Sequence, residues 1–121
     1  MLELAVTAVG GAIGSLLRYG VGLWYAKRTP RGDRATLTIN LTGSFILGLL
    51  IGLGIQEKIP LLYLFAGTGI LGGYTTYSTF MVQSVMMARE REYSRLARYL
   101  LLTCAGGILL GWAGVIISYS L

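Results

Sequence analysis

The segment from Gly67 to Ser84 (GTGILGGYTTYSTFMVQS) limits what this chain can fold into more than any other part of the sequence. It starts as an apolar run and changes after Gly72-Gly73 into a cluster of hydroxyl and aromatic side chains. Paired glycines weaken a helix, and several hydroxyl groups in one stretch are poorly suited to a helix that faces only lipid. The pattern therefore predicts a membrane helix that is broken at its centre.

The predicted break has two interpretations. Membrane helices tolerate breaks where the freed backbone groups find partners inside the protein or beside a water-filled cavity, and channels and transporters place ion sites there. Alternatively, Gly72 and Gly73 only let a neighbouring helix approach closely, as small residues do throughout membrane bundles. Spacing alone favours neither interpretation.

The rest of the chain is also typical of a membrane domain. Of its 121 residues, 55% are hydrophobic and only 12% are charged. A membrane helix needs about 20 predominantly apolar residues, and we expect four such spans, at about residues 4–26, 35–55, 61–88 and 96–119. Short loops connect them: Lys27–Arg34, Gln56–Pro60 and Arg89–Arg98. The sequence therefore predicts one all-α, multi-pass membrane domain with four transmembrane helices and both termini on one side.

Small residues in these spans predict close helix packing. Most of them recur four residues apart, which keeps them near one helix face. In the first span they include Gly10 and Gly14, in the second Gly43, Ser44, Gly48 and Gly52, and in the fourth Gly107 and Gly111.

Two polar residues inside the spans are candidates for function. Asn40 carries an amide with two N–H donors and an acceptor, which in hydrocarbon needs partners, either another helix or a permeating ion. Contact with another helix is the commoner case. Arg18 is costly within a span unless it meets a partner, or unless its side chain reaches the nearby basic loop. It is therefore a candidate for a vestibule or a structural charge.

The positions of the charges exclude other function classes. The five acidic residues fall at ends or in loops, so no span carries the carboxylate on which proton-coupled carriers rely. This argues against a small multidrug-resistance type proton-coupled exporter, which nevertheless stays open as an alternative function. The sequence also lacks a nucleophile and base, a metal-ligand cluster or a phosphate loop at usable spacing, so we expect no enzyme. The net charge of +5 comes from loops, which favours anionic lipid over nucleic acid as a contact.

Three motifs, in order along the chain, resemble the Fluc/CrcB fluoride channel family. They begin at Gly10 (GGAIGSLLRY), Thr38 (TINLTGSFILG) and Gly72 (GGYTTYSTF). The resemblance implies a four-span protein of the cell (plasma) membrane that works as an antiparallel, inverted dimer with two pores. It further implies passive release of cytoplasmic fluoride, which lowers the concentration and toxicity of that ion.

The resemblance also implies roles for individual residues. Asn40 would lie beside the ion path, and Tyr77 and Phe80 stand where the family usually has two phenylalanines. Four further hydroxyls would extend the path: Ser78, Thr79, Tyr99 and Thr103. Gly72 and Thr75 would offer backbone carbonyls to a buried structural sodium ion (Na⁺) at the dimer interface.

Physical chemistry is consistent with these roles. Fluoride is small and tightly hydrated, so a pore must replace its water with N–H and O–H donors. Aromatic rings are positive at their rims, so Tyr77 and Phe80 can turn edges toward an anion, although a plain core pair has the same spacing. The half-helix that ends at the break directs unpaired carbonyls and its negative dipole end inward, which suits a cation.

Two departures from the family pattern are Tyr77 in place of phenylalanine and Gln83 in place of the expected glutamate.

The distribution of basic residues complicates the orientation. The first and third loops hold eight Lys and Arg residues, whereas the second loop holds only Lys58. The positive-inside rule then predicts both termini outside, yet an antiparallel homodimer needs the same chain inserted both ways. Family grounds favour a homodimer, and the charge count favours a heterodimer with an oppositely oriented paralogue. A non-conducting subunit of such a heterodimer therefore stays open as an alternative function.

Overall fold

The computed structural model describes residues 1–29 and 32–121, and all regular elements in these ranges are helices. Three of them are long: α1 (Leu2–Ala26), α2 (Gly32–Gly52) and α7 (Tyr93–Tyr119). Between α2 and α7 lie shorter elements: α3 (Ile55–Lys58), α4 (Pro60–Tyr63), the π-helix η1 (Leu64–Leu71), α5 (Gly72–Tyr74) and α6 (Ser78–Arg89). The all-α fold class predicted from the sequence is confirmed.

The three long helices are each long and apolar enough to cross a membrane. The helices α2 and α7 start earlier than the predicted spans, at Gly32 and Tyr93. Asp33 thereby enters the first turn of α2, where a negative charge interacts favourably with the helix dipole. Pro30 and Arg31 of the predicted first loop lie outside the described residues. The chain is a multi-pass membrane protein.

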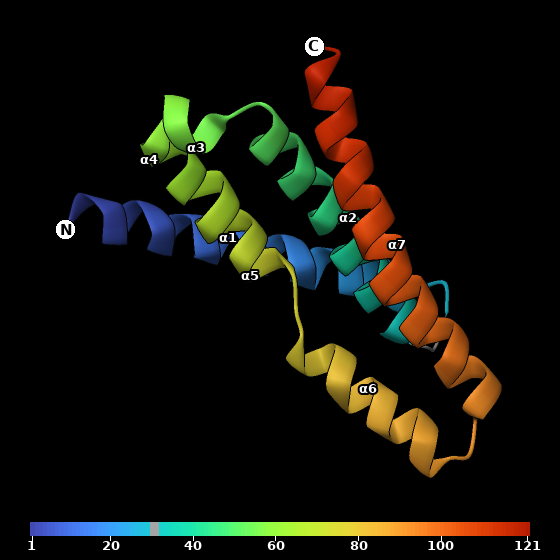
Figure 1. Cartoon of the computed structure of the whole chain (residues 1–121). Helices are drawn as coiled ribbons and strands as arrows, with labels where there is room; N and C mark the ends of the chain where they lie inside the picture. The colour runs from blue at the N-terminus through green and yellow to red at the C-terminus, as the bar shows by residue number, and fades with distance from the viewer. Residues whose placement is uncertain (30–31) are drawn as a thin grey trace.

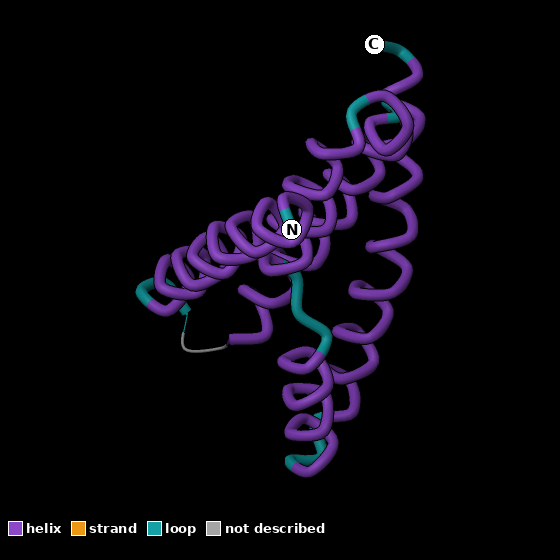
Figure 2. Tube along the Cα trace, turned by 90° about the vertical axis from the view of Figure 1, so that its left-hand side faces the viewer, coloured by secondary structure: helices purple, strands orange, loops and turns teal. Residues whose placement is uncertain are grey.

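The segment predicted as the third span is interrupted, and Figure 1 shows the extended connection between α5 and α6. The interruption covers Thr75–Tyr77, and Thr75 has extended backbone angles of φ −79° and ψ 157°. It lies just after Gly72 and Gly73, which are themselves helical, so the two glycines are not the point where the helix ends. In Figure 2 the same interruption is the loop that separates α6, at the bottom of the view, from the rest of the segment.

Close backbone contacts hold the long helices against their neighbours. α1 packs along η1 and α5, and α2 packs along α7. A Cβ atom on Gly14 would collide with the carbonyl oxygen of Ile70, and one on Gly48 would collide with that of Gly111. The small residues predicted for close packing therefore do bring backbones together at these two crossings. At Gly107 a Cβ would make only ordinary contact with Ser44, at 3.4 Å.

Both interpretations of the paired glycines are represented in the structure. A Cβ on Gly73 would collide with the carbonyl oxygen of Gly11 in α1, so this glycine serves close packing. A Cβ on Gly72 would meet nothing within 4 Å, and Gly72 is exposed. Gly72 therefore faces open space beside the break.

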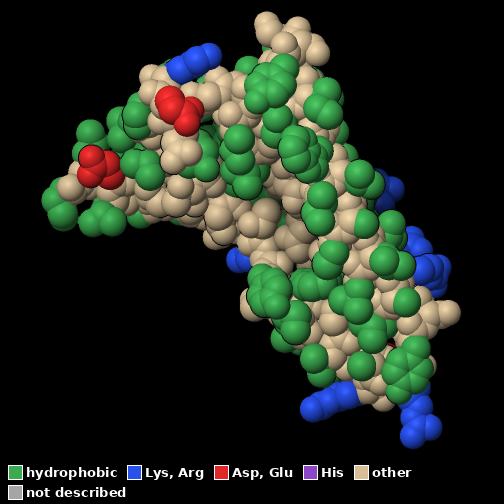
Figure 3. All heavy atoms as spheres, viewed as in Figure 1, with side chains coloured by type: hydrophobic (Ala, Val, Ile, Leu, Met, Phe, Trp, Pro, Cys, Tyr) green, Lys and Arg blue, Asp and Glu red, His purple; other side chains and the backbone are tan. Residues whose placement is uncertain are grey.

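The first and third loops lie at the same end of the molecule. Arg95, at the start of α7, forms ion pairs of 2.6 Å with Asp33 in α2 and with Glu92. In Figure 3 most visible Lys and Arg side chains lie along the right-hand and bottom edges, and apolar side chains cover much of the remaining face. Many large apolar side chains are exposed, among them Leu101, Leu109 and Trp112 at 63–68%. Such a surface fits lipid or a partner chain.

The crossing of α1 and η1 yields a stability prediction. Gly14→Ala should lower the free energy of unfolding by about 1–3 kcal/mol, because the added methyl group overpacks the contact with Ile70. Gly20→Ala on the same helix is the matched control, since a Cβ there meets nothing within 4 Å. It should change stability by at most about 1 kcal/mol, in the stabilising direction, through helix propensity. Unfolding in detergent measures both, and equal effects would contradict the packing argument.

Candidate functional site at the helix break

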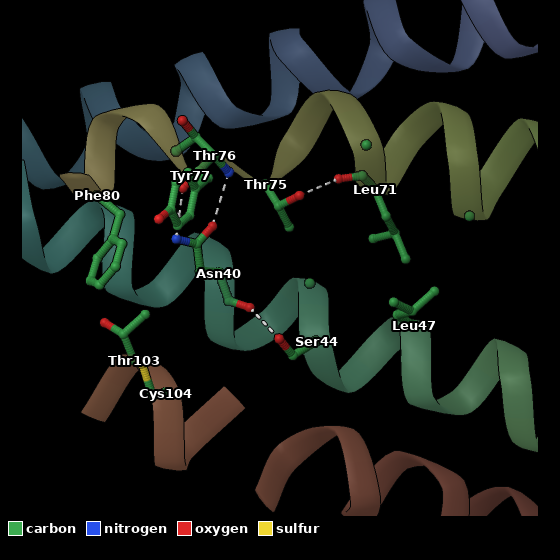
Figure 4. Close-up of a pocket in the computed structure, with 13 residues that line it drawn as sticks. Asn40, Ser44, Leu47, Leu71, Thr75, Thr76, Tyr77, Phe80, Thr103 and Cys104 are labelled. Carbon is green, nitrogen blue, oxygen red and sulfur yellow. Dashed lines mark hydrogen bonds between the residues drawn. The ribbon is translucent and has the colours of Figure 1, made fainter. Parts of the chain in front are cut away.

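A pocket of about 460 Å³ lies beside the interruption between α5 and α6 (Figure 4). Its walls come from α2, η1, α5, the interruption, α6 and α7, so all parts of the broken segment meet there. Six of the residues predicted for the ion path or the cation site line it: Asn40, Gly72, Thr75, Tyr77, Phe80 and Thr103. Additional lining residues include Ser44, Leu47, Leu71, Thr76 and Cys104.

Asn40 binds the backbone of Thr76 at the interruption through two hydrogen bonds. Its Nδ2 donates to the carbonyl oxygen of Thr76 at 3.0 Å, and the amide of Thr76 donates to Asn40 Oδ1 at 2.9 Å. The backbone groups freed by the break thus find partners on α2, as buried polar groups in a membrane require. Asn40 is therefore a contact between helices, and it also lines the pocket.

Thr76 is a residue whose importance the sequence reasoning missed. Its Oγ1 accepts the amide hydrogen of Thr79 at 3.3 Å and donates to Thr79 Oγ1 at 3.2 Å, so it caps the first turn of α6. The N-cap residue itself is Tyr77, which makes no side-chain cap bond, so Thr76 acts from one residue earlier. A threonine just before a helix is the signal that could have identified it. Ser78 and Thr79 themselves are exposed in the single chain and do not line the pocket.

Phe80 belongs to both the pocket wall and the small buried core. It is only 7% exposed, and its ring centroid lies 5.2 Å from that of Tyr99 and 6.2 Å from that of Tyr77. Tyr77, in contrast to Phe80, is 73% exposed. The core role and the pocket role considered for Phe80 are therefore compatible.

Two hydroxyl residues of α7 differ in their partners. Tyr99 is buried, and its hydroxyl donates to Gln83 Oε1 at 2.6 Å rather than lining the pocket. Thr103 does line the pocket, and its Oγ1 is buried without a hydrogen-bond partner among residues 1–29 and 32–121. Leaving a buried hydroxyl unpaired is unfavourable, so this group has room for a partner that the single chain does not supply.

The carbonyls of Gly72 and Thr75 have lost the donors that a continuous helix would give them. The amide of Thr76, four residues after Gly72, donates to Asn40 instead. The amide of Thr79, four residues after Thr75, donates to Thr76 Oγ1 instead. Oxygen atoms of this kind are the ligands that hard cations prefer, so both residues fit a cation site.

Arg18 lies apart from this pocket. It is half-buried on α1, and no hydrogen bond or ion pair of its side chain occurs within the part of the chain that the structure describes. The structure therefore does not bring Arg18 to the candidate site.

Comparisons with known proteins place the chain among small membrane proteins of one family. The family model described as "CrcB-like protein, Camphor Resistance (CrcB)" matches residues 5–115. The "Fluoride-specific ion channel FluC 1" of Halalkalibacterium halodurans is 44% identical over 123 residues, which cover 93% of this chain and 97% of that protein. The "Fluoride-specific ion channel FluC" of Gloeobacter violaceus is 39% identical, and a "Fluoride-specific ion channel FluC 2" of Bacillus cereus is 37% identical. These alignments cover 98% and 95% of this chain and 98% and 96% of those proteins.

The hydrogen bond between Tyr99 and Gln83 can be tested by a double-mutant cycle. Tyr99→Phe and Gln83→Leu should each lower the free energy of unfolding by about 1 kcal/mol, because each leaves the other polar group unpaired. The double variant should lose less than the sum, by about 0.5 kcal/mol or more. Tyr93→Phe, at an exposed position of the same helix, is the control and should have no effect. Strict additivity in unfolding experiments would show that the two side chains do not interact.

Proposed function

This chain belongs to the CrcB-like protein family, and on that premise we propose that it is a fluoride-specific ion channel of the plasma membrane. It carries fluoride passively out of the cytoplasm and so lowers the toxicity of that ion. It is a channel and not an enzyme. The names of its relatives and the extent of the alignments support this activity.

The observation that carries the proposal is the buried, unpaired hydroxyl of Thr103 in the pocket beside Asn40. Fluoride gives up strongly bound water to enter a pore, so the protein must offer donors in its place. Thr103 and Asn40 both line the pocket, and their side chains carry the O–H and N–H donors that such a site needs. These donors are neutral, and they suit an anion without requiring a proton to travel with it.

The aromatic residues support the same path. The Phe80 ring forms part of the pocket wall and packs against Tyr99, which fixes the direction of its edge. Ring edges carry partial positive charge, so Phe80 can contact an anion while it excludes water. Tyr77 lines the pocket but is largely exposed, whereas Ser78 and Thr79 are exposed and lie outside the pocket, so a second subunit would have to complete the path at these residues.

The working unit in this proposal is an antiparallel dimer of four-span subunits. The second subunit covers the exposed apolar surface and the open side of the pocket. Both subunits are copies of this chain, and a heterodimer with an oppositely inserted paralogue is the alternative. Arg18 serves as a vestibule or structural charge.

Sodium is the proposed structural cofactor. Its ligands are the backbone carbonyls of Gly72 and Thr75, whose helical donors are engaged elsewhere. Two carbonyls are too few for a hard cation, but a symmetric dimer supplies four. Bound there, the ion would neutralise the carbonyl ends of two half-helices and hold the subunits together.

The channel activity is testable in liposomes loaded with fluoride. The wild-type protein should release fluoride without a proton gradient and should not release chloride, because the pocket offers only a few donors for a small anion. Asn40→Asp should abolish release, since a carboxylate repels the anion, and Phe80→Ile should abolish it by removing the ring edge. Phe65→Ile is the matched control, because Phe65 lies on η1 and does not line the pocket.

Other outcomes of the same assay would support other functions. Chloride release at a similar rate would refute fluoride selectivity. Uptake of an organic cation driven by a pH gradient would indicate a proton-coupled exporter. If this chain alone released no fluoride and a second chain restored the release, this chain would be identified as a non-conducting subunit.

The homodimer can be tested by membrane topology. Tags on each terminus of the chain in cells should be labelled from both sides of the membrane, because a homodimer needs both orientations. Labelling from one side only would exclude the homodimer and support a paralogous partner.

A further inference from the structure

One hydrogen bond connects the pocket with the proposed cation site. The amide of Thr76 donates to Asn40 Oδ1 at 2.9 Å. In an unbroken helix this amide would donate to the carbonyl of Gly72, four residues earlier. By accepting it, Asn40 leaves the Gly72 carbonyl free for another partner.

The same hydrogen bond also orients the second carbonyl. The amide N–H of Thr76 and the carbonyl of Thr75 belong to one peptide unit, and the described residues contain no cis peptide bond. In a planar trans peptide these two groups point in opposite directions. Holding the N–H against Asn40 therefore fixes the Thr75 carbonyl on the side away from Asn40.

We infer that Asn40 is a positioning residue for the cation site: its Oδ1 frees the Gly72 carbonyl and aims the Thr75 carbonyl, which couples cation binding to the pocket. This inference rests on the proposed function, which supplies the cation. A cation at the Thr75 oxygen polarises the peptide and strengthens the N–H bond to Asn40. Because coupling between two sites is reciprocal, an ordered Asn40 in turn favours the cation.

A purely structural role for Asn40 makes a different prediction. If Asn40 only fastens α2 to the interruption, its removal lowers stability equally at every sodium concentration. If it positions the two carbonyls, its removal also raises the sodium concentration needed for half of the stabilising effect. The sodium dependence of unfolding therefore separates the two roles without any measurement of conduction.

The experiment uses the full-length protein purified in detergent without fluoride. Thermal unfolding is followed over a series of NaCl concentrations, with N-methylglucamine chloride keeping the ionic strength constant. For Asn40→Leu, which keeps the side-chain size, the half-effect concentration of sodium should rise about tenfold, a typical coupling between sites. Thr42→Val is the matched control, because it removes the hydrogen bond that joins the Thr42 and Tyr74 hydroxyls, between α2 and α5, without touching Thr76. It should lower the unfolding temperature and leave the sodium dependence unchanged.

A second pair of variants tests the amide itself. Thr76→Pro removes both the hydroxyl and the N–H, whereas Thr76→Ala removes the hydroxyl only. Thr75 already has the extended backbone that a residue before proline adopts. Thr76→Pro should raise the half-effect concentration as Asn40→Leu does, and Thr76→Ala should not.

Several results would overturn the inference. An unchanged half-effect concentration in Asn40→Leu or Thr76→Pro would leave Asn40 with a fastening role only. In the wild-type protein, saturating fluoride should lower the half-effect concentration, and an unchanged value would refute the coupling even if neither variant folds. A wild-type protein whose unfolding ignores sodium would refute both the cation site and the inference. Fluoride release by the same preparation would then leave the channel function standing.

Discussion

The paired hydrogen bonds between the Asn40 side chain and the Thr76 backbone are the interaction on which the rest of the structure depends. A helix that stops inside a membrane exposes amides and carbonyls that hydrocarbon cannot satisfy. Asn40 satisfies both backbone groups of Thr76, at 2.9 and 3.0 Å, and so allows the chain to leave and re-enter the helix. The turn into α6 then places Phe80 in the pocket wall and leaves two carbonyls, those of Gly72 and Thr75, without their helical donors.

Much of the fold was accessible from the sequence because membrane helices obey strong local rules. Long apolar runs predict α1, α2 and α7, and small residues such as Gly14 and Gly48 predict where backbones meet. The position of the break was not accessible in the same way. Glycine suggests an ending at Gly72-Gly73, but Gly73 gains a close contact with α1 and stays helical. The helix ends at Thr75 because the following amide, that of Thr76, donates to Asn40 on α2. This is a tertiary effect that local helix propensity does not contain.

The candidate site could likewise be predicted from the sequence only in part. Asn40, Phe80 and Thr103 could be singled out by residue type and by resemblance, and the fold brings them to one pocket. The importance of Thr76 lies in its backbone, which no side-chain pattern reveals, although a threonine just before a helix is a recognisable capping signal. Tyr99 was expected on the ion path, and in the single chain its hydroxyl is engaged by Gln83 instead.

The ion pair between Asp33 and Arg95 has a consequence for the order of events during synthesis. Its two residues are 62 positions apart, so the bond can form only after the ribosome has made the start of the last helix. While the first two helices are being made, Asp33 therefore still lacks this partner. The pair therefore cannot help to place the first two helices as they are made; it holds the start of α2 against the start of α7 once both are present.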